Sequence, residues 1–508
     1  MSELPAVTAA KLRIPVSCIK DFEVRRKSVD SRKKPYIQFV YTVDFDTEKK
    51  LHIPKKLSAD ISVVDTAAER PLPPSPGEVP LASRPLVVGM GPAGLFAALE
   101  LAKAGYRPLV LERGPAMDRR IDAVERFRRE RVLDPEANML FGEGGAGTFS
   151  DGKIGTGIKD GLIREVLKEF RDAGAGDDIM YLAKPHIGTD VLREVIINIR
   201  KKIEKLGGEI LFDTKLESLV IEDGRLTAAV IMHDGKRERI PADALILAIG
   251  HSARDTFSMI SAAGLSMQQK PFSIGVRMEH PQSLIDEAQY GRENSGKLPP
   301  ADYRINYKAS NGRGVYSFCM CPGGEVVVCS TRDGELCVNG MSNRKRDSGT
   351  ANSGILCDVR TEDFGSDDVL AGVRFQQKYE RLAFINGGGD FTAPACSMDA
   401  FLNGTPEAAK VTDSLPDFAA EAIREAVPDF ARRIHGYDDP SAIVTAVETR
   451  SSSPVRIVRD EHGESNIKGV YPAGEGAGYA GGITSAACDG IRAAWHIIER
   501  YHPQQPVL

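Results

Sequence analysis

The segment RPLVVGMGPAGLFAALELAKAGYRPLVLERG constrains the fold of this chain more than any other part of the sequence. A short apolar strand over residues 86–88 leads into a helix through Gly89, Gly91 and Gly94, which have the spacing G-x-G-x-x-G. The first glycine permits a tight turn, the second lets the backbone approach a pyrophosphate, and the third lets helix and strand pack closely. The free N–H groups at the start of the helix would face the phosphates. The segment therefore predicts the first half of a dinucleotide-binding βαβ unit.

The remainder of this segment supplies the second half of the unit. Helix residues 93–104 are nearly all small or apolar, and a second strand over 108–111 ends at Glu112. An acid at that place can accept hydrogen bonds from the ribose hydroxyls of an adenosine. Glu112, in place of an arginine, favours a free 2′-hydroxyl, and hence FAD or NAD over NADP.

A second glycine-rich loop, FGEGGAGTFSDGKIGTG over 141–157, follows this unit. Because it carries few side chains, its backbone amides can contact a flat or anionic ligand. Phe141 and Phe149 bracket the glycines, so we expect an anchored loop rather than a mobile one. The loop residues that we assign to ligand binding are Gly144, Gly145 and Ser150.

Two later segments also bring glycines to the end of a predicted strand. The apolar run within ADALILAIGHSARDT ends at Gly250, and a strand near 470–471 runs into AGEGAGYAGG before a helix begins near Ile483. In open α/β sheets, ligands bind outside the carboxyl ends of the strands. Three strand ends would therefore deliver glycine turns to one crevice, and the residues assigned to it here are Gly250, Gly474, Glu475, Gly482 and Ile483.

In this order, the motifs resemble the FAD-binding domain of the glutathione-reductase-like flavoprotein superfamily. The segments FGEGGAGTFSDGK, KPHIGTD, FCMCPGG and ETRSSSPVRI are similar to those of a bacterial group of uncharacterised FAD-dependent dehydrogenases, over residues 14–500. The resemblance implies a non-covalent FAD, with the fingerprint glycines and Glu112 on its ADP half. It places residues 474–483 near the ribityl and pyrimidine end, with Glu475 where most of the superfamily has Asp. The resemblance names no substrate.

The proline-rich stretch PLPPSPGEVPLASRP, residues 71–85, divides the chain. Its prolines can neither continue a helix nor donate to a sheet ladder, so we interpret the stretch as a linker. Before it, the apolar residues of 37–45 recur with a period of two, which predicts a half-buried strand. We assign residues 1–70 to a small α+β domain.

After the linker, short apolar runs alternate with glycine turns and helix-like stretches, which is typical of a parallel sheet covered by helices. We assign 86–260 to the first part of a Rossmann-like FAD-binding domain, and 440–508 to its completion. Between them, 265–435 has short β-like runs and a helical stretch over 416–433, so we interpret it as an inserted α+β substrate domain. The predicted fold class is α/β.

Three side chains close to these motifs are candidates for catalysis: Lys153, His186 and His251. Lys153 would offer positive charge beside a reduced flavin, and the histidines would act as proton donors. The alternative for each histidine is a hydrogen bond that serves only the fold. Cys319 and Cys321, which share one face of a strand by alternation, are either a redox-active pair or structural thiols.

Two groups of basic residues leave similar alternatives. Arg450 and Arg456 in ETRSSSPVRI would either clamp an anionic substrate or pin a loop to a carboxylate. The stretch VRRKSVDSRKKP over 24–35 would bind RNA if it formed a basic face. Because no aromatic residues are interleaved with its charges, we expect a solvated face and no nucleic-acid partner.

Composition narrows the class of protein. The net charge is −5, from 66 Lys and Arg against 71 Asp and Glu, which excludes a globally basic nucleic-acid coat. The first residues lack the apolar stretch of a secretory signal, and the longest apolar run is broken by glycine and proline. The eight cysteines show no disulfide or metal-ligand spacing. We expect a soluble cytoplasmic protein with no metal site and no membrane contact.

These patterns favour an FAD-dependent oxidoreductase of the dehydrogenase type, which transfers hydride between the flavin and a small organic substrate. Two alternatives stay open: a flavoprotein that acts on RNA through its basic amino-terminal domain, and a scaffold that binds FAD without turnover. No second fingerprint occurs in 265–435, so we expect no dedicated nicotinamide domain. Electrons would come from transiently bound NAD(P)H or from a protein partner.

Overall fold

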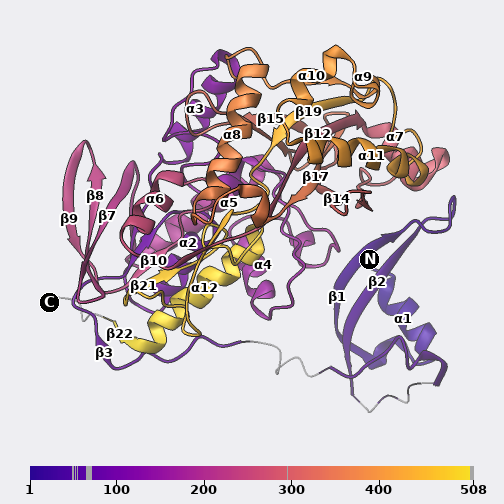
Figure 1. Ribbon diagram of the computed structural model, residues 1–508. Coiled ribbons are helices and arrows are strands. Elements are labelled where there is room, and N and C mark those ends of the chain that lie inside the picture. The colour runs from indigo at the N-terminus through magenta and orange to yellow at the C-terminus, as the bar shows by residue number, and fades with distance from the viewer. Residues whose placement is uncertain (49–50, 52, 54, 65–70, 295, 504–508) are drawn as a thin grey trace.

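The computed structural model describes residues 1–48, 51, 53, 55–64, 71–294 and 296–503 (Figure 1). Two sheets organise the main body, one parallel and one antiparallel, each with helices packed against it. The predicted α/β class is confirmed. None of the helices in the described part of the chain is both long and apolar enough to cross a membrane.

The parallel sheet has five short strands, and every neighbouring pair runs in the same direction. In spatial order they are β21 (Val470–Pro472), β10 (Leu245–Leu247), β4 (Leu86–Val88), β5 (Leu109–Leu111) and β6 (Glu209–Leu211). The strands predicted after the linker, near 245 and near 470 are therefore confirmed, and β4 lies between β10 and β5. The second glycine loop follows α3 (Met117–Glu130), which comes after β5.

The two faces of this sheet have different cover, because successive side chains of a strand point to opposite sides. One face, with Val87 and Ile246, packs against helices. Those helices are α2 (Pro92–Lys103), α4 (Leu162–Asp172), α5 (Thr189–Lys205) and α12 (Ile483–Arg500). The other face, with Leu86 and Leu245, packs against an antiparallel meander that the sequence patterns did not predict. The meander is β7 (Thr214–Glu222), β8 (Arg225–His233) and β9 (Lys236–Pro241), followed along the chain by β10 and α6 (Arg254–Ala262).

The second sheet has six strands, and all of its pairs are antiparallel. Its spatial order is β13 (Asn306–Lys308), β14 (Gly314–Cys321), β17 (Thr350–Val359), β12 (Phe272–Pro281), β19 (Ile443–Glu448) and β18 (Ala395–Ser397). The associated helices are α7 (Gln282–Tyr290), α8 (Ala371–Asn386), α9 (Met398–Asn403), α10 (Pro406–Thr412) and α11 (Asp417–Arg433). The helix predicted over 416–433 is α11.

One predicted boundary is wrong. The assignment of residues 440–508 to the first domain places β19 with the parallel sheet, but β19 pairs with β12 and β18 in the antiparallel sheet. Its buried valines and alanine join the core of that sheet, which is the reason it lies there. Two small antiparallel pairs complete this region: β15 (Glu325–Cys329) with β16 (Cys337–Met341), and β11 (Met267–Gln269) with β20 (Val455–Ile457).

The amino-terminal segment forms α1 (Leu4–Leu12) and a hairpin of β1 (Ile19–Asp30) with β2 (Gln38–Thr47), which lies beside the main body (Figure 1). The predicted strand is present, but none of its side chains is fully buried and Phe39 is 43% exposed. The hairpin is tied to the body through the backbone of Lys27, whose N–H donates to the Tyr181 carbonyl (2.6 Å).

The proline-rich stretch is only partly a linker. Val79 and Pro80 form the short strand β3, which pairs in parallel with β22 (Tyr501–His502) at the end of the chain. Two residues of the stretch that we interpreted as a linker therefore join a sheet. Pro80 is accommodated because a two-stranded edge needs few donors.

Candidate functional site

The carboxyl ends of β4, β5, β10 and β21 open into one cleft, which encloses roughly 1730 Å³ of space between atoms, part of it open to solvent. Glycines that follow β4, β10 and β21, namely Gly89, Gly250 and Gly482, all line it. Its opposite wall comes from the antiparallel region and includes Phe318 and Cys319 of β14, Asn339 of β16, and Arg450 and Ser451 after β19.

The three fingerprint glycines have three different surroundings. Gly89 has a φ of +96°, and a Cβ there would lie 2.4 Å from the Ala248 carbonyl oxygen. A Cβ on Gly94 would lie 1.9 Å from the Gly89 oxygen, so Gly94 allows the helix to pack on the turn but does not line the cleft. Gly91 lines the cleft, and the nearest atom to its Cβ position is Gly145 Cα at 3.9 Å. Only Gly89 and Gly91 are thus at the cleft wall.

Glu112 joins three segments of this wall. Its Oε2 accepts from Met90 N (2.8 Å), and its Oε1 accepts from Gly114 N (2.9 Å) and Gly142 N (3.0 Å). The side chain is buried, with 4% exposed, and lines the cleft. A carboxylate has about four acceptor positions. The three amides leave one for a ribose hydroxyl, so Glu112 holds the fingerprint turn and the second loop together as well as facing the ligand.

The second glycine loop is anchored, as predicted. Arg120 is fully buried beneath it and donates to the carbonyls of Asn138 (3.0 Å) and Glu143 (2.6 Å). Arginine side chains also pack on the two bracketing rings: Arg113 is 4.0 Å from the Phe141 centroid and Arg120 is 4.8 Å from that of Phe149. These contacts hold the loop rigidly against the fingerprint turn.

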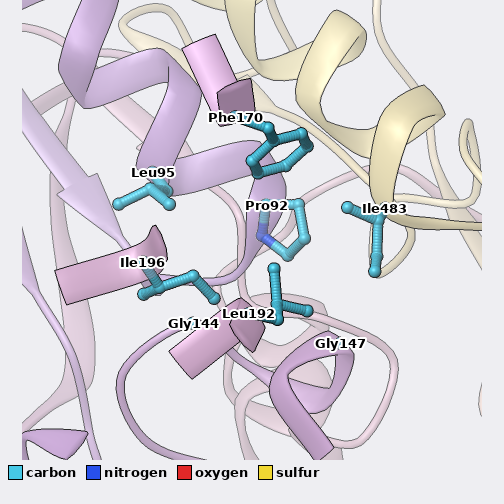
Figure 2. Close-up of a pocket in the computed structure, with 8 residues that line it drawn as sticks. All are labelled: Pro92, Leu95, Gly144, Gly147, Phe170, Leu192, Ile196 and Ile483. Carbon is cyan, nitrogen blue, oxygen red and sulfur yellow. The ribbon is translucent and has the colours of Figure 1, made fainter. Parts of the chain in front are cut away.

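Behind this loop lies a small apolar pocket, shown in Figure 2. It is lined by Pro92, Leu95, Gly144, Gly147, Phe170, Leu192, Ile196 and Ile483. Gly144, which we assigned to the ligand, faces this pocket, where its Cβ would lie 2.5 Å from Ile196 Cδ1. Gly144 is therefore a packing residue, whereas Gly145 and Ser150 line the main cleft.

The carboxy-terminal cluster presents a second helix start to the cleft. Gly482 is the N-cap of α12, and Gly481, Gly482 and Ile483 line the cleft with no atom within 4 Å of either glycine's Cβ position. Helix α12 packs closely on α2, since a Cβ on Gly490 would lie 2.0 Å from the Ala93 oxygen. Two helix N-termini, with their free N–H groups and positive dipole ends, therefore face one cleft.

Two predicted residues from distant segments meet in the cleft. His251 Nδ1 lies 3.4 Å from Glu475 Oε1, and both side chains line the cleft beside Gly250. The His251 ring is 9% exposed, and its Nε2 has no hydrogen-bond partner among the described residues. Gly474 does not line the cleft; its N–H donates to Asp489 (2.7 Å) and thereby fixes the turn.

Lys153 lies where the cleft meets a second groove. Its Nζ is 2.6 Å from the buried Asp151 carboxylate, 3.9 Å from Cys319 Sγ and 3.6 Å from Cys321 Sγ. Burial lowers the pKa of Lys153, but the electrostatic influence of Cys319, Cys321 and Asp151 outweighs burial and holds that pKa above its usual value. Lys153 is therefore a permanent cation in the wall of the cleft.

The second groove runs along β13 and β14 and encloses roughly 2430 Å³, much of it open. Both hollows share Lys153, Gly155, Phe318 and Cys319. The two hollows therefore lie side by side along one short stretch of wall.

Two of the predicted polar candidates lie elsewhere. His186 does not line the cleft; its Nε2 is 3.2 Å from the Arg344 carbonyl oxygen, and burial lowers the pKa of His186 to about 4. The ring is neutral at pH 7 and contacts a backbone carbonyl outside the cleft, so the structure gives His186 a place in the fold and none in the cleft lining. Arg450 does line the cleft, but its guanidinium is paired with Glu380 (2.8 Å), whereas Arg456 is exposed. The pair does not form a clamp.

Two of the six cations in the basic amino-terminal stretch pair with acids of the same hairpin. Arg25 pairs with Asp44, and Arg32 pairs with Asp30 (2.6 Å). Lys27 lies 4.7 Å from the centre of the Phe39 ring. These contacts agree with a solvated face.

Several cleft residues carried no signal in the sequence. Examples are Thr214 and Leu216 of β7, Asn339 of β16, and Ser252. Each reaches the cleft through a strand pairing or turn that only the complete fold defines. By contrast, Met90, Pro92, Ala93 and Arg113 lie within the fingerprint or directly after Glu112, so the sequence could have indicated them.

Comparison with known proteins places the chain in a family. A protein of Clostridium beijerinckii, described as uncharacterized, is 44% identical over 510 residues, which cover 97% of this chain and 95% of the relative. The chain belongs to the same family as this clostridial protein. In the present chain, residues 271–451 match the family described as FAD-dependent protein, C-terminal domain-like. Residues 1–46 match a domain of unknown function, DUF8436.

Solved flavoprotein structures are also similar, at low identity. The flavin-dependent brominase Bmp2 triple mutant has a TM-score of 0.38 and 14% identity, over 81% of this chain and 78% of the brominase. A geranylgeranyl bacteriochlorophyll reductase-like protein of Thermoplasma acidophilum has a TM-score of 0.36 and 16% identity, over 81% and 76% of the two chains. Because these values are low, the assignment of the cofactor rests on the family match and on the cleft. Membership of the glutathione-reductase-like superfamily stays a prediction.

FAD is the cofactor of the present protein, and the residues of the cleft fit it. Side chains are missing where a pyrophosphate would approach: the Cβ positions of Gly91, Gly481 and Gly482 meet no atom closer than 3.9 Å. Buried polar atoms without a partner among the described residues, His251 Nε2 and Ser252 Oγ, lie in the cleft lining. The cleft lining thus combines open glycine turns with two buried polar groups that have no partner among the described residues.

Proposed function

We propose that this protein is an FAD-dependent oxidoreductase of the dehydrogenase type that acts on a small organic substrate. The observation that carries the proposal is the junction of the dinucleotide cleft with the groove along β14, at Lys153 and Cys319. When bound, FAD supplies reversible hydride chemistry, which the protein orients and tunes. A cofactor held only for structure would need no second hollow beside its site.

We propose that the fingerprint and the α12 N-terminus share the binding of the cofactor's phosphates. Gly91 leaves the first turn of α2 open, and Gly482 does the same for α12, so both sets of free N–H groups can donate to anionic oxygens. Glu112 keeps one acceptor position for the adenosine ribose. The residues proposed to hold FAD in the cleft are Gly89, Gly91, Glu112, Gly145, Ser150, Gly250, Glu475, Gly482 and Ile483.

Two side chains are proposed to tune the reaction. Lys153 is a fixed cation that would stabilise negative charge on a reduced flavin or on a substrate. His251 lines the cleft beside Glu475, with Nδ1 3.4 Å from Oε1, and its Nε2 has no partner among the described residues, so we propose that this ring donates or accepts a proton in the reaction. Exchange of His251 for Asn should lower turnover much more than FAD affinity.

The test begins with the purified protein, which should be yellow and should release intact FAD on denaturation. Anaerobic mixing with NADH, NADPH and a panel of small alcohols, acids and thiols, followed by flavin absorbance, then identifies a reductant. A colourless preparation that gains no thermal stability from added FAD would overturn the proposal, since a ligand at 100 times its dissociation constant stabilises by about 2.7 kcal/mol.

We further propose that the electron donor binds without a nicotinamide domain of its own. The second sheet is antiparallel throughout the described residues, and so differs from the parallel unit in which a Rossmann fold holds a dinucleotide. NAD(P)H would then enter the open groove transiently, or a protein partner would deliver the electrons. Submicromolar binding of NADH or NADPH in calorimetry, with FAD in place, would contradict this.

A further inference from the structure

The motif Cys319–Met320–Cys321 lies at an irregular point of β14. The pairing of β14 with β17 shifts register between Phe318 and Cys321, and Cys319 has a φ of +42°, which is rare for a residue with a side chain. Such bulges re-aim side chains and are common beside functional sites. The regular alternation of a strand therefore does not describe the placement of these two thiols.

The two thiols differ in access. Cys319 lines both the cleft and the groove and is partly exposed, whereas Cys321 is fully buried and lines neither hollow. The Cys321 thiol lies 3.2 Å from the Cys319 carbonyl oxygen, behind the accessible residue. One thiol is therefore open to a partner from either hollow, and the other is closed to both.

Two cations flank the pair. Lys153 Nζ lies within 4 Å of both sulfurs and is itself held by Asp151, which Arg346 also contacts (2.8 Å). On the buried side, Arg277 donates to the Cys319 carbonyl (3.0 Å), and its Nη1 lies 4.0 Å from Cys321 Sγ. Positive charge so close to a thiol favours the thiolate.

The electrostatics separate the two sulfurs. A hydrogen bond from Cys321 lowers the pKa of Cys319, and Lys153 and Arg277 act in the same direction. That same hydrogen bond, together with burial, raises the pKa of Cys321. The pair thus favours a Cys319 thiolate next to a protonated Cys321, the state in which one sulfur attacks and the other keeps its proton until the S–S bond forms.

We propose that Cys319 and Cys321 are a redox-active pair that exchanges two electrons with the bound FAD. In the oxidative direction, the Cys319 thiolate and the Cys321 thiol lose two electrons and one proton as their S–S bond forms. The flavin ring takes up both electrons and the proton, so atoms and charge balance. The proposal rests on the proposed function, and it makes the Lys153–Cys319 junction the place where electrons pass between cleft and groove.

The decisive measurement counts electrons in the holoprotein. The protein is oxidised with diamide, desalted, and titrated anaerobically with dithionite while flavin absorbance and free thiols are followed. Wild type should consume about two dithionite equivalents per FAD, one for the flavin and one for the disulfide, because each is a two-electron couple. Cys319→Ser and Cys321→Ser should each consume about one.

The matched control is another buried cysteine pair. Cys329 and Cys337 lie directly opposite each other on β15 and β16 and do not line the cleft. The C329A/C337A protein should keep the wild-type value of about two equivalents. A wild type that takes up about one equivalent, or an extra equivalent that survives in C319S, overturns the proposal. A protein without a flavin spectrum instead refutes the proposed function, so the two failures are distinct.

A second readout tests Lys153 without any turnover. Alkylation of Cys319 by iodoacetamide, located by mass spectrometry, should proceed readily at pH 6 in wild type. Lys153→Met should slow it at least tenfold at that pH, and Lys153→Arg should restore most of the rate. Equal rates in wild type and K153M would show that Lys153 does not support the thiolate, and would overturn its part in the proposal.

Discussion

The two walls of the cleft are built from different kinds of residue. The wall from the parallel sheet consists largely of glycine turns and backbone amides, as at Gly91 and Gly482. The wall from the antiparallel sheet instead rests on buried charge: Arg277 and Glu448 are 0% and 3% exposed and their Nε and Oε2 atoms are 2.6 Å apart. The first wall provides shape and dipoles suited to a dinucleotide, and the second holds charged groups and two thiols in fixed positions.

Because of this difference, different kinds of substitution should reduce stability or ligand binding in each wall. In the wall from the parallel sheet, called here the glycine wall, an added carbon atom obstructs the ligand or the backbone. In the wall from the antiparallel sheet, called here the charged wall, removal of one ion leaves its partner buried without compensation. The following substitutions test whether the two walls are separate in this sense.

The largest effect is expected from Arg277→Met. This change leaves Glu448 buried without its cation and also removes hydrogen bonds to Asn352 (3.0 Å) and to the Cys319 carbonyl. Breaking a buried pair from one side typically costs about 3 to 5 kcal/mol. Denaturant unfolding should show that loss for R277M and a smaller loss for R277M/E448M, in which no lone charge remains. Equal stability of wild type and R277M would mean that the pair is not held as described.

The next effect concerns Glu112→Ala. Three buried amides, from Met90, Gly114 and Gly142, would lose their acceptor, and each unsatisfied donor costs about 1 to 3 kcal/mol unless water replaces it. We expect a clear loss of stability in the apoprotein as well as weaker FAD retention. Glu112→Gln should be milder, because its oxygen can still accept. An E112A protein with normal stability and weak FAD binding would instead show that the carboxylate acts on the ribose alone.

Glu112 shows which parts of the site could be predicted from the sequence alone and which could not. Its position after β5 followed from local pattern, because strand, turn and helix are set by neighbouring residues, and so it was predicted correctly. Its bond to Gly142 could not be predicted, since that amide comes from a separate loop. Local motifs thus indicated the glycine wall, while contacts between distant segments decided what each residue does in it.

The charged wall shows the opposite balance. Nothing in the spacing of FCMCPGG indicates that Lys153 would reach both sulfurs from the second glycine loop. The pairing of β19 with β12, which brings Glu448 to Arg277, was likewise missed because the domain boundary was drawn before it. His186 looked catalytic beside a motif, but its ring turns to the Arg344 carbonyl. Antiparallel sheets join remote segments, and a single sequence carries little information on which ones.

A third prediction sharpens the description of the glycine wall. Gly91→Ala adds a carbon whose nearest neighbour is Gly145 Cα at 3.9 Å, so the fold should accept it. The same carbon occupies the approach to the pyrophosphate, and FAD affinity should fall at least tenfold, or about 1.4 kcal/mol. Gly157→Ala, where no atom lies within 4 Å of the added carbon, is the control. Fluorescence titration of the apoproteins with FAD measures the difference, and equal affinities would exclude Gly91 from the phosphate site.

The smallest effect concerns pH and the fold-serving histidine. Burial lowers the pKa of His186 from 6.5 to about 4, so the folded protein binds this proton less readily than the unfolded chain does. The neutral ring therefore contributes fully to the free energy of unfolding above pH 6.5. This contribution is lost as the pH falls from 6.5 toward 4. Because the side chain is only partly buried, we expect the loss to be about 1 kcal/mol.

Denaturant unfolding at pH 7 and pH 4.5 should show that His186→Gln removes this part of the pH dependence, whereas His435→Gln, at an exposed position, leaves it in place. If H186Q and H435Q lose the same stability between the two values, another group is responsible for the acid sensitivity. If instead H186Q abolishes turnover at pH 7 while FAD stays bound, His186 is one of the catalytic groups. The charged wall would then include residues that do not line the cleft.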